Sequence, residues 1–371
     1  MADISKRLDS IDALRGFDMI FIMGFSALIS NICALFPGGD QSWLAGQMNH
    51  VAWNGLAHHD TIFPLFLFIS GMTFPFSLGK KLEKGMSMKK VWLDVLRRGL
   101  VLVFLGLVYD GFFKLQFATL RWPSVLGRIG LAWMFAAMIY LGVRKVRWRV
   151  LIAAVILVGY WVLHMFVAPG AAPGTDPVSI EGSWAAYIDR MLIPNHLYKP
   201  GIFDPEGLVS TLPAIVTAML GMFTGEFIRL PESRISGGRK TVLMLIAAVV
   251  FLVIGLLWNM VFPINKQLWT SSFVMVLAAW SLGLFSIFYY IMDVRGWKKW
   301  AFPFQVIGLN SITIYMAQRI VDFGKINSFF FKGFADLFPE SVGAVVLSLT
   351  YVCVCWLFLY FLYKKKVFLK V

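Results

Sequence analysis

Charged residues are scarce in this chain of 371 residues: Asp, Glu, Lys and Arg make up 15% of the sequence, whereas soluble domains average about 25%. There are three cysteines, Cys33, Cys353 and Cys355, and all lie in apolar runs, where free cysteine behaves as a small hydrophobic residue. The P-loop, the Rossmann glycine pattern and the G-x-S-x-G motif are missing as well. These absences exclude a soluble globular domain and a disulfide scaffold, and they argue against an ATP-driven pump or a lipase.

Hydrophobic residues make up 59% of the sequence and gather in long runs. A membrane-spanning helix needs roughly 20 mostly apolar residues, and about ten segments meet that criterion. Helices satisfy their own backbone hydrogen bonds in lipid, so we predict an all-α polytopic membrane bundle formed by a single domain over residues 1–371. The first run exceeds a signal-peptide core of about 7–15 residues, and we expect it to stay as a helix. The predicted spans are 11–36, 57–79, 91–109, 125–143, 148–168, 209–228, 240–262, 268–291, 301–325 and 342–363.

The net charge of +14 is distributed unevenly along the chain. Lys and Arg gather between alternate apolar segments, which by the positive-inside rule predicts that both termini are cytoplasmic. Topology and lipid headgroups then explain the basic charge, and no nucleic-acid partner is predicted. The largest loop on the non-cytoplasmic side is expected at about 169–208.

Three of the five histidines, His50, His58 and His59, fall just before or at the start of the second predicted helix. Histidine exchanges protons near neutral pH, and an ionisable residue at the edge of a membrane bundle is a functional candidate. The same cluster is also typical of a polar helix start at the headgroup level. A metal site from His58, His59 and Asp60 is disfavoured, because adjacent helical residues point about 100° apart. No metal is therefore predicted.

Two further groups of charged residues leave alternatives open. Arg15 either pairs with an aspartate of the first helix, such as Asp12 at i−3, or presents its guanidinium to a phosphate. In the loop, Asp189, Asp204 and Glu206 either contact a polar ligand or cap a helix and order the loop through Arg190 and Lys199.

Short motifs along nearly the whole chain resemble one known family. Their order and spacing are similar to those of a bacterial member of the heparan-alpha-glucosaminide N-acetyltransferase family, within the wider transmembrane acyltransferase superfamily. The markers are Asp12-Ala-Leu-Arg-Gly16, His50-x-x-Trp53-Asn54-Gly55, Asp60-x-x-Phe63-Pro64, Ala186-Tyr-Ile-Asp-Arg190, His196-Leu-Tyr198, Asp204-Pro-Glu-Gly207, Asn265-Lys266-x-Leu268-Trp269 and Asn310-Ser311.

The resemblance implies an activity and a direction. The lysosomal enzyme of this family moves acetyl from cytosolic acetyl-CoA to a glucosamine amine across the membrane. Its active-site histidine matches His50. An asparagine important in the family appears here as Ser26 in an ungapped register, which places the acetyl contacts in question. The implied setting is the inner membrane, with the mouth of the active site facing the periplasm.

With that resemblance, each candidate residue has an expected role. His50 is expected to act as general base, with Asp60 orienting it and Asn54 or Asn49 donating to the oxyanion. We expect the CoA phosphates to bind guanidinium groups, because these match phosphate geometry. The expected donor contacts are Arg15, Arg97, Arg98 and Ser26, and the expected acceptor contacts are Asn49, Trp53, Asp189, Asp204 and Glu206.

Several alternatives remain at this point. The acceptor is an amino sugar, an oligosaccharide or a hydroxyl of a cell-surface glycan, and transfer is either direct or through an acetyl-histidine. A multi-pass transporter would predict helices broken symmetrically in two halves, and no such repeat is visible. A non-catalytic scaffold would not bind acetyl-CoA. Membrane lipids are expected partners, and a homodimer is left open.

Overall fold

The computed structural model describes residues 8–198 and 201–369, and every regular element in that part of the chain is helical. Three short turns of helix, η2 (Gly39–Gln41), η3 (Phe112–Lys114) and η5 (Lys299–Ala301), join longer elements. The elements are α1 (Asp9–Ile20), η1 (Phe21–Phe25), α2 (Ser26–Cys33), α3 (Trp43–Gln47), α4 (His58–Glu83), α5 (Met88–Tyr109), α6 (Val125–Gly142), α7 (Val146–Leu163), α8 (Trp184–Leu192), α9 (Thr211–Ile228), α10 (Gly237–Asn259), α11 (Ser271–Tyr289), η4 (Tyr290–Val294), α12 (Phe302–Leu309), α13 (Ser311–Ile320), α14 (Phe323–Ala335) and α15 (Glu340–Lys364).

The prediction of an all-α polytopic membrane bundle is confirmed. Within the described residues, eight helical stretches are long and apolar enough to cross a membrane, and each overlaps a predicted span. The other two predicted spans differ in detail. The helix α5 is long but rich in charge in its first half, and the expected span at 301–325 is divided at Asn310 into α12 and α13. The number of crossings therefore stays a prediction.

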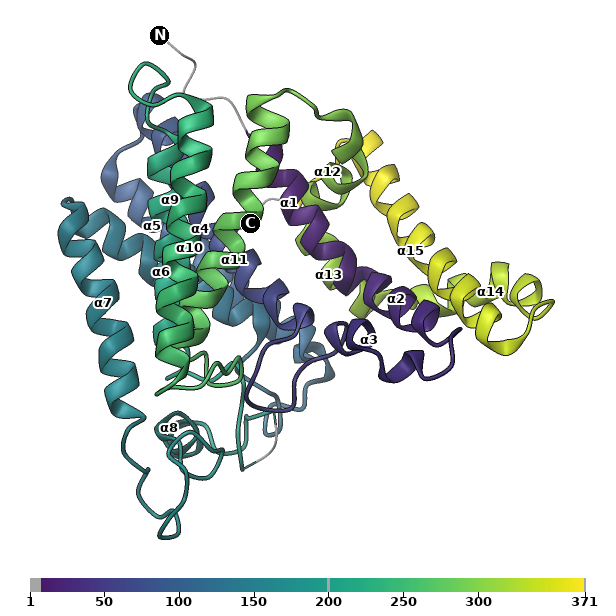
Figure 1. Cartoon of the computed structure of the whole chain (residues 1–371), viewed down its shortest axis with the longest axis horizontal. Helices are drawn as coiled ribbons and strands as arrows, with labels where there is room; N and C mark the ends of the chain where they lie inside the picture. Colours follow the sequence, from purple (N-terminus) through teal and green to yellow (C-terminus); the bar gives the residue numbers. More distant parts are fainter. Residues whose placement is uncertain (1–7, 199–200, 370–371) are drawn as a thin grey trace.

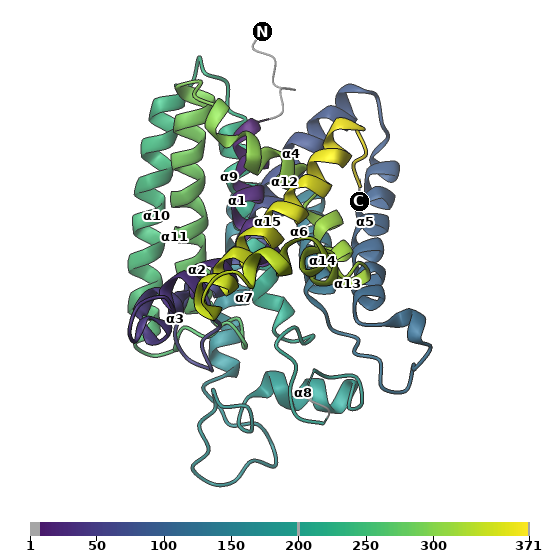
Figure 2. The same cartoon turned by 90° about the vertical axis from the view of Figure 1, so that its right-hand side faces the viewer.

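The long helices run in similar directions and give the molecule two distinct ends (Figures 1 and 2). Helix α1 begins and α15 finishes at one end, which we call the inner end. The helix α8 and the long loop around it lie at the opposite, outer end. The hairpin of α14 and α15 extends to one side of the bundle in Figure 1. Helix α4 lies in the interior, packed against α9, α6 and α11.

Close helix packing depends on glycine at two crossings. A Cβ atom added at Gly71 would lie 2.1 Å from the Ala218 carbonyl oxygen, which fixes the approach of α4 to α9. A Cβ atom at Gly308 would lie 1.8 Å from the Asp12 carbonyl oxygen. Small residues let membrane helices approach closely in this way. As a result α12 lies directly against the turn of α1 that carries Arg15.

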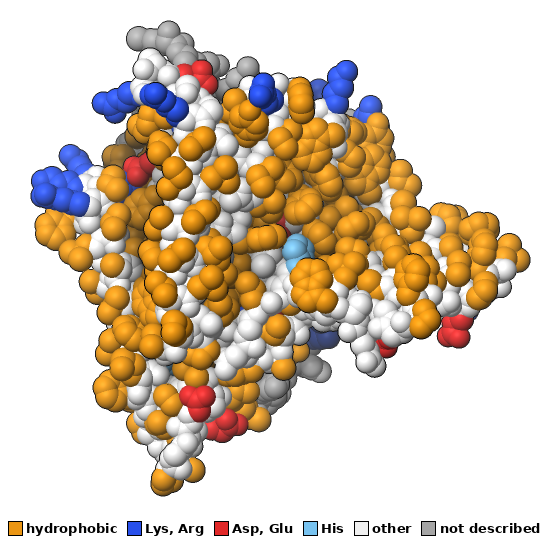
Figure 3. Space-filling view, viewed as in Figure 1, with side chains coloured by type: hydrophobic (Ala, Val, Ile, Leu, Met, Phe, Trp, Pro, Cys, Tyr) orange, Lys and Arg blue, Asp and Glu red, His pale blue; other side chains and the backbone are white. Residues whose placement is uncertain are grey.

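The surface is mostly apolar along the length of the bundle, as expected for a lipid-facing wall (Figure 3). Most of the Lys and Arg side chains visible in that view lie along the inner end, and Asp and Glu are more frequent toward the outer end. This asymmetry is the one that the predicted topology requires.

Candidate active site

The His50 imidazole lies beside the start of α4, where the Asp60 carboxylate holds it. The His50 Nδ1 and Asp60 Oδ1 atoms are 2.7 Å apart. The other carboxylate oxygen of Asp60 accepts hydrogen bonds from the backbone N–H groups of Val51 (3.3 Å) and Ala57 (3.1 Å). Asp60 is 1% exposed, whereas the His50 side chain is 52% exposed. The carboxylate is therefore fixed by the helix start, and it leaves Nε2 of His50 as the nitrogen able to accept a proton.

The Lys266 ammonium group lies next to the same imidazole. Its Nζ atom is 3.1 Å from His50 Nδ1, 3.3 Å from His50 Nε2 and 3.4 Å from Asp60 Oδ1. Burial lowers the pKa of Lys266, and the charges of Asp60 and Glu206 oppose that shift. The outer end of α4 thus carries an imidazole, its carboxylate partner and an ammonium group in mutual contact.

The loop that carries His50 is tied to the loop that carries Lys266. The Gly55 N–H donates to the Ile264 carbonyl at 2.8 Å, and the Asn265 amide donates to Asn54 Oδ1 at 3.1 Å. Asn54 is exposed. The predicted oxyanion donor is therefore close to the site and is also part of the link between the two loops.

The other predicted residues of the His50 segment have structural partners. The Trp53 indole donates to the Val178 carbonyl at 2.9 Å, which joins the segment to the long outer loop. Asn49 is exposed, and its amide donates to the Ala45 carbonyl at 3.0 Å. Their roles as acceptor contacts stay predictions.

The rings of His59 and His58 contact different partners. The His59 ring is 4.5 Å from the His50 ring, and its Nδ1 atom is 3.2 Å from the Ser26 hydroxyl. The His58 ring instead contacts Phe21, at 4.3 Å between ring centroids. Ser26 thus contacts His59, which in turn contacts His50. Within residues 8–198 and 201–369, no group of three or more His, Cys, Asp or Glu is arranged to hold a metal ion.

Two carboxylates of the outer loop are enclosed by Arg121. Its guanidinium donates two hydrogen bonds to Asp204, at 2.6 and 2.8 Å, and another to Glu206. Asp204 is 1% exposed and also accepts from the backbone N–H groups of Tyr198 (2.7 Å) and Glu206 (2.8 Å). Burial alone would lower the pKa of Arg121, but the bonds to the two carboxylates raise it further above its usual range. These contacts order the loop at the outer mouth.

The remaining predicted acidic residue, Asp189, is fully buried. Its carboxylate accepts from the Leu208 N–H at 2.9 Å, and burial raises the pKa of Asp189 to about 6. Arg190 donates to the backbone carbonyl of Ile202 at 3.1 Å, and Lys199 lies outside the described residues. The surroundings of Asp189 and Asp204 correspond to loop ordering, which was one of the two alternatives; an acceptor contact by either carboxylate stays a prediction.

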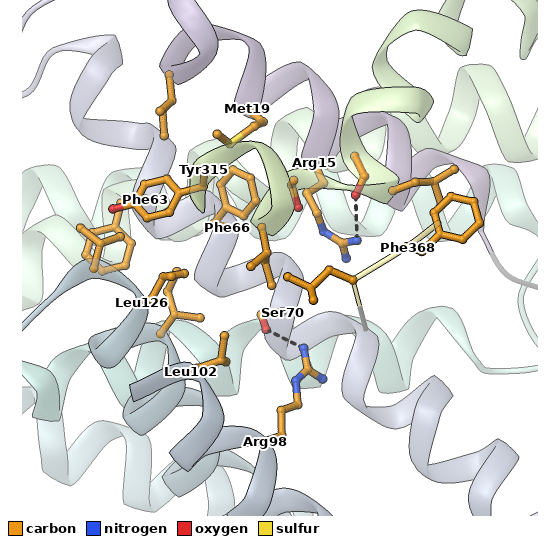
Figure 4. A pocket seen from close by; sticks show the side chains of 18 residues that line it. Arg15, Met19, Phe63, Phe66, Ser70, Arg98, Leu102, Leu126, Tyr315 and Phe368 are labelled. Carbon is orange, nitrogen blue, oxygen red and sulfur yellow. Dashed lines mark hydrogen bonds between the residues drawn. The ribbon is translucent and has the colours of Figure 1, made fainter. Parts of the chain in front are cut away.

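A cavity of about 490 Å³ runs along α4 toward the inner end, between α1, α5, α6, α12 and α13 (Figure 4). Apolar side chains form most of its wall, and Arg15 and Arg98 are the arginines that line it. Arg15 donates to the Gly308 carbonyl and pairs with Asp12, both at 3.4 Å. Arg98 donates weakly to the Ser70 hydroxyl at 3.5 Å, and its guanidinium lies 4.2 Å from the Trp133 ring centroid.

The third predicted arginine, Arg97, lies outside this cavity. It is exposed and lines a neighbouring depression with Lys81 and Asp94, and Arg98 lines both this depression and the cavity. The chain after α15 returns to the main cavity, where the Asn310 amide donates to the Val367 carbonyl at 3.1 Å. Phe368 is part of the cavity wall near Arg15 (Figure 4).

The cavity and the His50 group are connected through α4. Phe63 lines the cavity and lies less than one helical turn beyond Asp60. Ser70, which Arg98 contacts, is about 15 Å further along the helix than Asp60 at 1.5 Å per residue. Asp60, which holds the imidazole, and Ser70, which Arg98 contacts, thus lie at different depths along the same helix.

Comparison of the sequence with known proteins finds relatives of this chain. The sequence profile of a domain of unknown function, DUF5009, matches residues 7–114. The human heparan-alpha-glucosaminide N-acetyltransferase is 25% identical over 426 aligned positions that cover 100% of this chain, and the mouse protein of the same name is 26% identical over 99% of it. The resemblance predicted from the motifs is confirmed. The chain spans 61% of the length of either relative.

Sequence reasoning missed the roles of Lys266 and Arg121. Lys266 belongs to one of the marker motifs of the family resemblance, but nothing in its spacing indicates a contact with a histidine 216 positions away. Arg121 lies in a short loop without a motif. In that case the signal in the sequence was the pair of acidic residues Asp204 and Glu206, because carboxylates that become buried need a nearby cation.

Proposed function

We propose that the protein is a membrane acetyltransferase that moves the acetyl group of acetyl-CoA from the inner end of the bundle to an amino sugar at the outer end. One observation carries the proposal: Asp60, which holds His50, lies less than one helical turn from Phe63, which lines a cavity that also presents two arginines. The names of the human and mouse relatives support the same reaction class. By the distribution of Lys and Arg, we assign the inner end to the cytoplasm.

In the proposed complex, acetyl-CoA lies lengthwise in the cavity. The phosphates of CoA are separated from its sulfur by a long flexible arm. Arg15 and Arg98 would bind the phosphates through charge-assisted hydrogen bonds, and the apolar wall would bind the arm. The thioester would then lie near Phe63, close to His50. Arg97, which is exposed outside the cavity, is proposed to add only long-range attraction.

The chemical step follows from the orientation of the imidazole. The acceptor nitrogen attacks the thioester carbonyl carbon, an N–C bond forms and the C–S bond breaks. Nε2 of His50 takes a proton from the acceptor nitrogen and returns a proton to the departing sulfur. Asp60 holds the ring in the required tautomer, because it accepts the Nδ1 proton. Asn54 is proposed as a donor to the carbonyl oxygen during attack.

The acceptor is proposed to enter from the outer mouth, which the Arg121-bound loop forms. In a bacterial cell this mouth would face the periplasm from the inner membrane. Glu206 is proposed as the acceptor contact of this loop, because it is less buried than Asp189 and Asp204. Asp189 and Asp204 are proposed to hold the loop that presents it.

The experiment uses purified protein, labelled acetyl-CoA and a panel of amino sugars, oligosaccharides and hydroxyl acceptors. We expect a labelled N-acetyl sugar with the wild-type protein and none with His50→Ala. An O-acetylated product alone would replace the amine acceptor by a hydroxyl. Transport of a panel compound without acetylation would contradict the proposed function.

A further inference from the structure

The cation at Lys266 is not needed to orient His50, since Asp60 already does so. The two groups nevertheless contact each other, with Lys266 Nζ within 3.3 Å of both ring nitrogens. A like charge disfavours protonation of a neighbouring imidazole, whereas a carboxylate favours it. We propose that Lys266 acts through His50: its charge opposes that of Asp60 at the ring, disfavours the imidazolium and so favours the base form.

The position of Lys266 is set by the fold. Asn265, the preceding residue, is fully buried, and its side-chain oxygen accepts from the Leu268 N–H at 2.8 Å. Its backbone N–H donates to the Thr270 hydroxyl at 3.0 Å. Together with the Asn265–Asn54 bond, these contacts hold the turn before α11 against the His50 loop. Lys266 itself is 16% exposed, so its ammonium has little freedom to leave the imidazole.

The charged groups around the imidazole and its Lys266 neighbour come from four segments. From α4, Asp60 contributes a negative charge, and the His59 ring lies 4.5 Å away. From the turn before α11, Lys266 contributes a positive charge. Glu206, in the outer loop, acts on Lys266 from further away. Arg128 of α6 acts on Lys266 as well, with the opposite sign. Without Lys266, the Asp60 carboxylate would be the nearest charged group to the His50 ring, and it would favour the imidazolium.

This role fits both halves of the proposed reaction, on which the inference rests. Before attack, a neutral imidazole is available to take the proton of the acceptor. After attack, the imidazolium lies beside Lys266, and their repulsion favours release of the proton to the sulfur of CoA. Lys266 therefore favours transfer of the proton from His50 to the sulfur after the acceptor has been deprotonated.

The first experiment measures kcat/KM against pH for wild type, Lys266→Met and Lys266→Arg. Loss of the cation should move the acid limb of the profile upward by about 1 unit, the low end of the range for a neighbouring charge because the imidazole is half exposed. Activity of Lys266→Met at pH 6.5 should fall by a factor below ten, because a shift of 1 unit gives the full tenfold only well below the limb, and it should recover at pH 8.5. Lys266→Arg should keep the wild-type profile. A uniform loss at all pH values, with the limb unmoved, would overturn the proposal.

A second measurement is independent of the transferase activity. Diethyl pyrocarbonate modifies the neutral imidazole, and the extent of modification at His50 can be read by peptide mass spectrometry without any substrate. The midpoint of its pH dependence should rise in Lys266→Met and in Lys266→Gln but not in the control Lys325→Met, whose exposed side chain pairs with Asp322 on α14. An unchanged midpoint in both variants would refute the inference. Absence of acetyl transfer at any pH would refute the proposed function but would leave this measurement decisive.

Discussion

The side chains around the outer and inner parts of α4 differ in how tightly they are held. At the outer end, His50, Asp60 and Lys266 contact one another at 2.7–3.4 Å, and the carboxylate is fixed by backbone N–H groups. At the inner end, Arg15 and Arg98 make hydrogen bonds of 3.4–3.5 Å on the wall of an apolar cavity. A proton transfer requires fixed geometry, whereas an anion site requires donors that can turn to the ligand. The contrast matches the proposed division between a reacting centre at the outer end and a donor site at the inner end.

The contrast also predicts what each end contributes to the kinetics. Changes at the outer end should lower kcat, because they act on the transition state. Changes at the inner end should raise the KM for acetyl-CoA and leave the chemical step intact. The predictions below test that division, beginning with the largest effect.

Replacing His50 by Ala should have the largest effect. General-base catalysis contributes roughly 10²–10⁴-fold, so kcat should fall by about that factor. The His50 side chain is half exposed, so the melting temperature and acetyl-CoA binding should stay close to wild type. Turnover near the wild-type rate would contradict the assignment of the base. Labelled acetyl-CoA without acceptor should leave no covalent label on the wild-type protein, and a stable acetyl-histidine would contradict direct transfer.

Replacing Arg121 by Gln should lower stability more than it lowers the chemical rate. The change leaves Asp204 and Glu206 without their shared cation in a buried setting, and removing one partner of such a group costs about 3–5 kcal/mol. Thermal unfolding in detergent should therefore occur at a clearly lower temperature. Arg190→Gln is the matched control, because Arg190 bonds to backbone carbonyls. Equal melting temperatures for Arg121→Gln and wild type would show that the outer mouth does not depend on this group.

Replacing Arg98 by Gln should weaken acetyl-CoA binding without an equal change in kcat. A hydrogen bond to a charged group contributes about 1.5–3 kcal/mol, which corresponds to roughly 10–100-fold in Kd. Arg15→Gln should act in the same direction. Arg97→Gln is the control, since Arg97 is exposed outside the cavity and should change Kd by less than about threefold. A larger effect at Arg97 than at Arg98 would move the donor site out of the cavity.

The sequence predicted the helical architecture well and the contacts between loops poorly. Apolar runs locate membrane helices because lipid imposes the same requirement on each of them. The division at Asn310 escaped this reasoning, because one polar residue within an apolar run is also common in an unbroken helix. Asp60 could be associated with a histidine because both lie within one short segment.

The contact between Lys266 and His50 could not be predicted in that way. It depends on two loops, distant in sequence, that meet through the Gly55–Ile264 and Asn54–Asn265 hydrogen bonds. Local pattern carries no information on such pairing. For the same reason, the sequence associates the acidic residues of the outer loop with the nearby Arg190, whereas in the structure Asp204 pairs with Arg121.

The smallest effect should be a change in the pH dependence of stability at the outer end. Burial raises the pKa of Asp189 to about 6, above its ordinary value near 4. The folded state therefore binds a proton more tightly than the unfolded state, and this carboxyl stabilises the fold less as pH rises from about 4 to 6. Asp189→Asn keeps an acceptor oxygen for the Leu208 N–H and removes the titration.

The variant should thus show a melting temperature that falls less between pH 4 and pH 6 than that of wild type, and one equal to or above the wild-type value at pH 7. Asp110→Asn serves as the comparison, because burial also raises the pKa of Asp110 to about 6, and its slope should change in the same direction. Identical slopes for wild type and Asp189→Asn would mean that the carboxyl is no less solvated in the fold than in the unfolded chain. The outer loop would then be open to water, and Asp189 would become available to a ligand instead of holding the wall of the mouth.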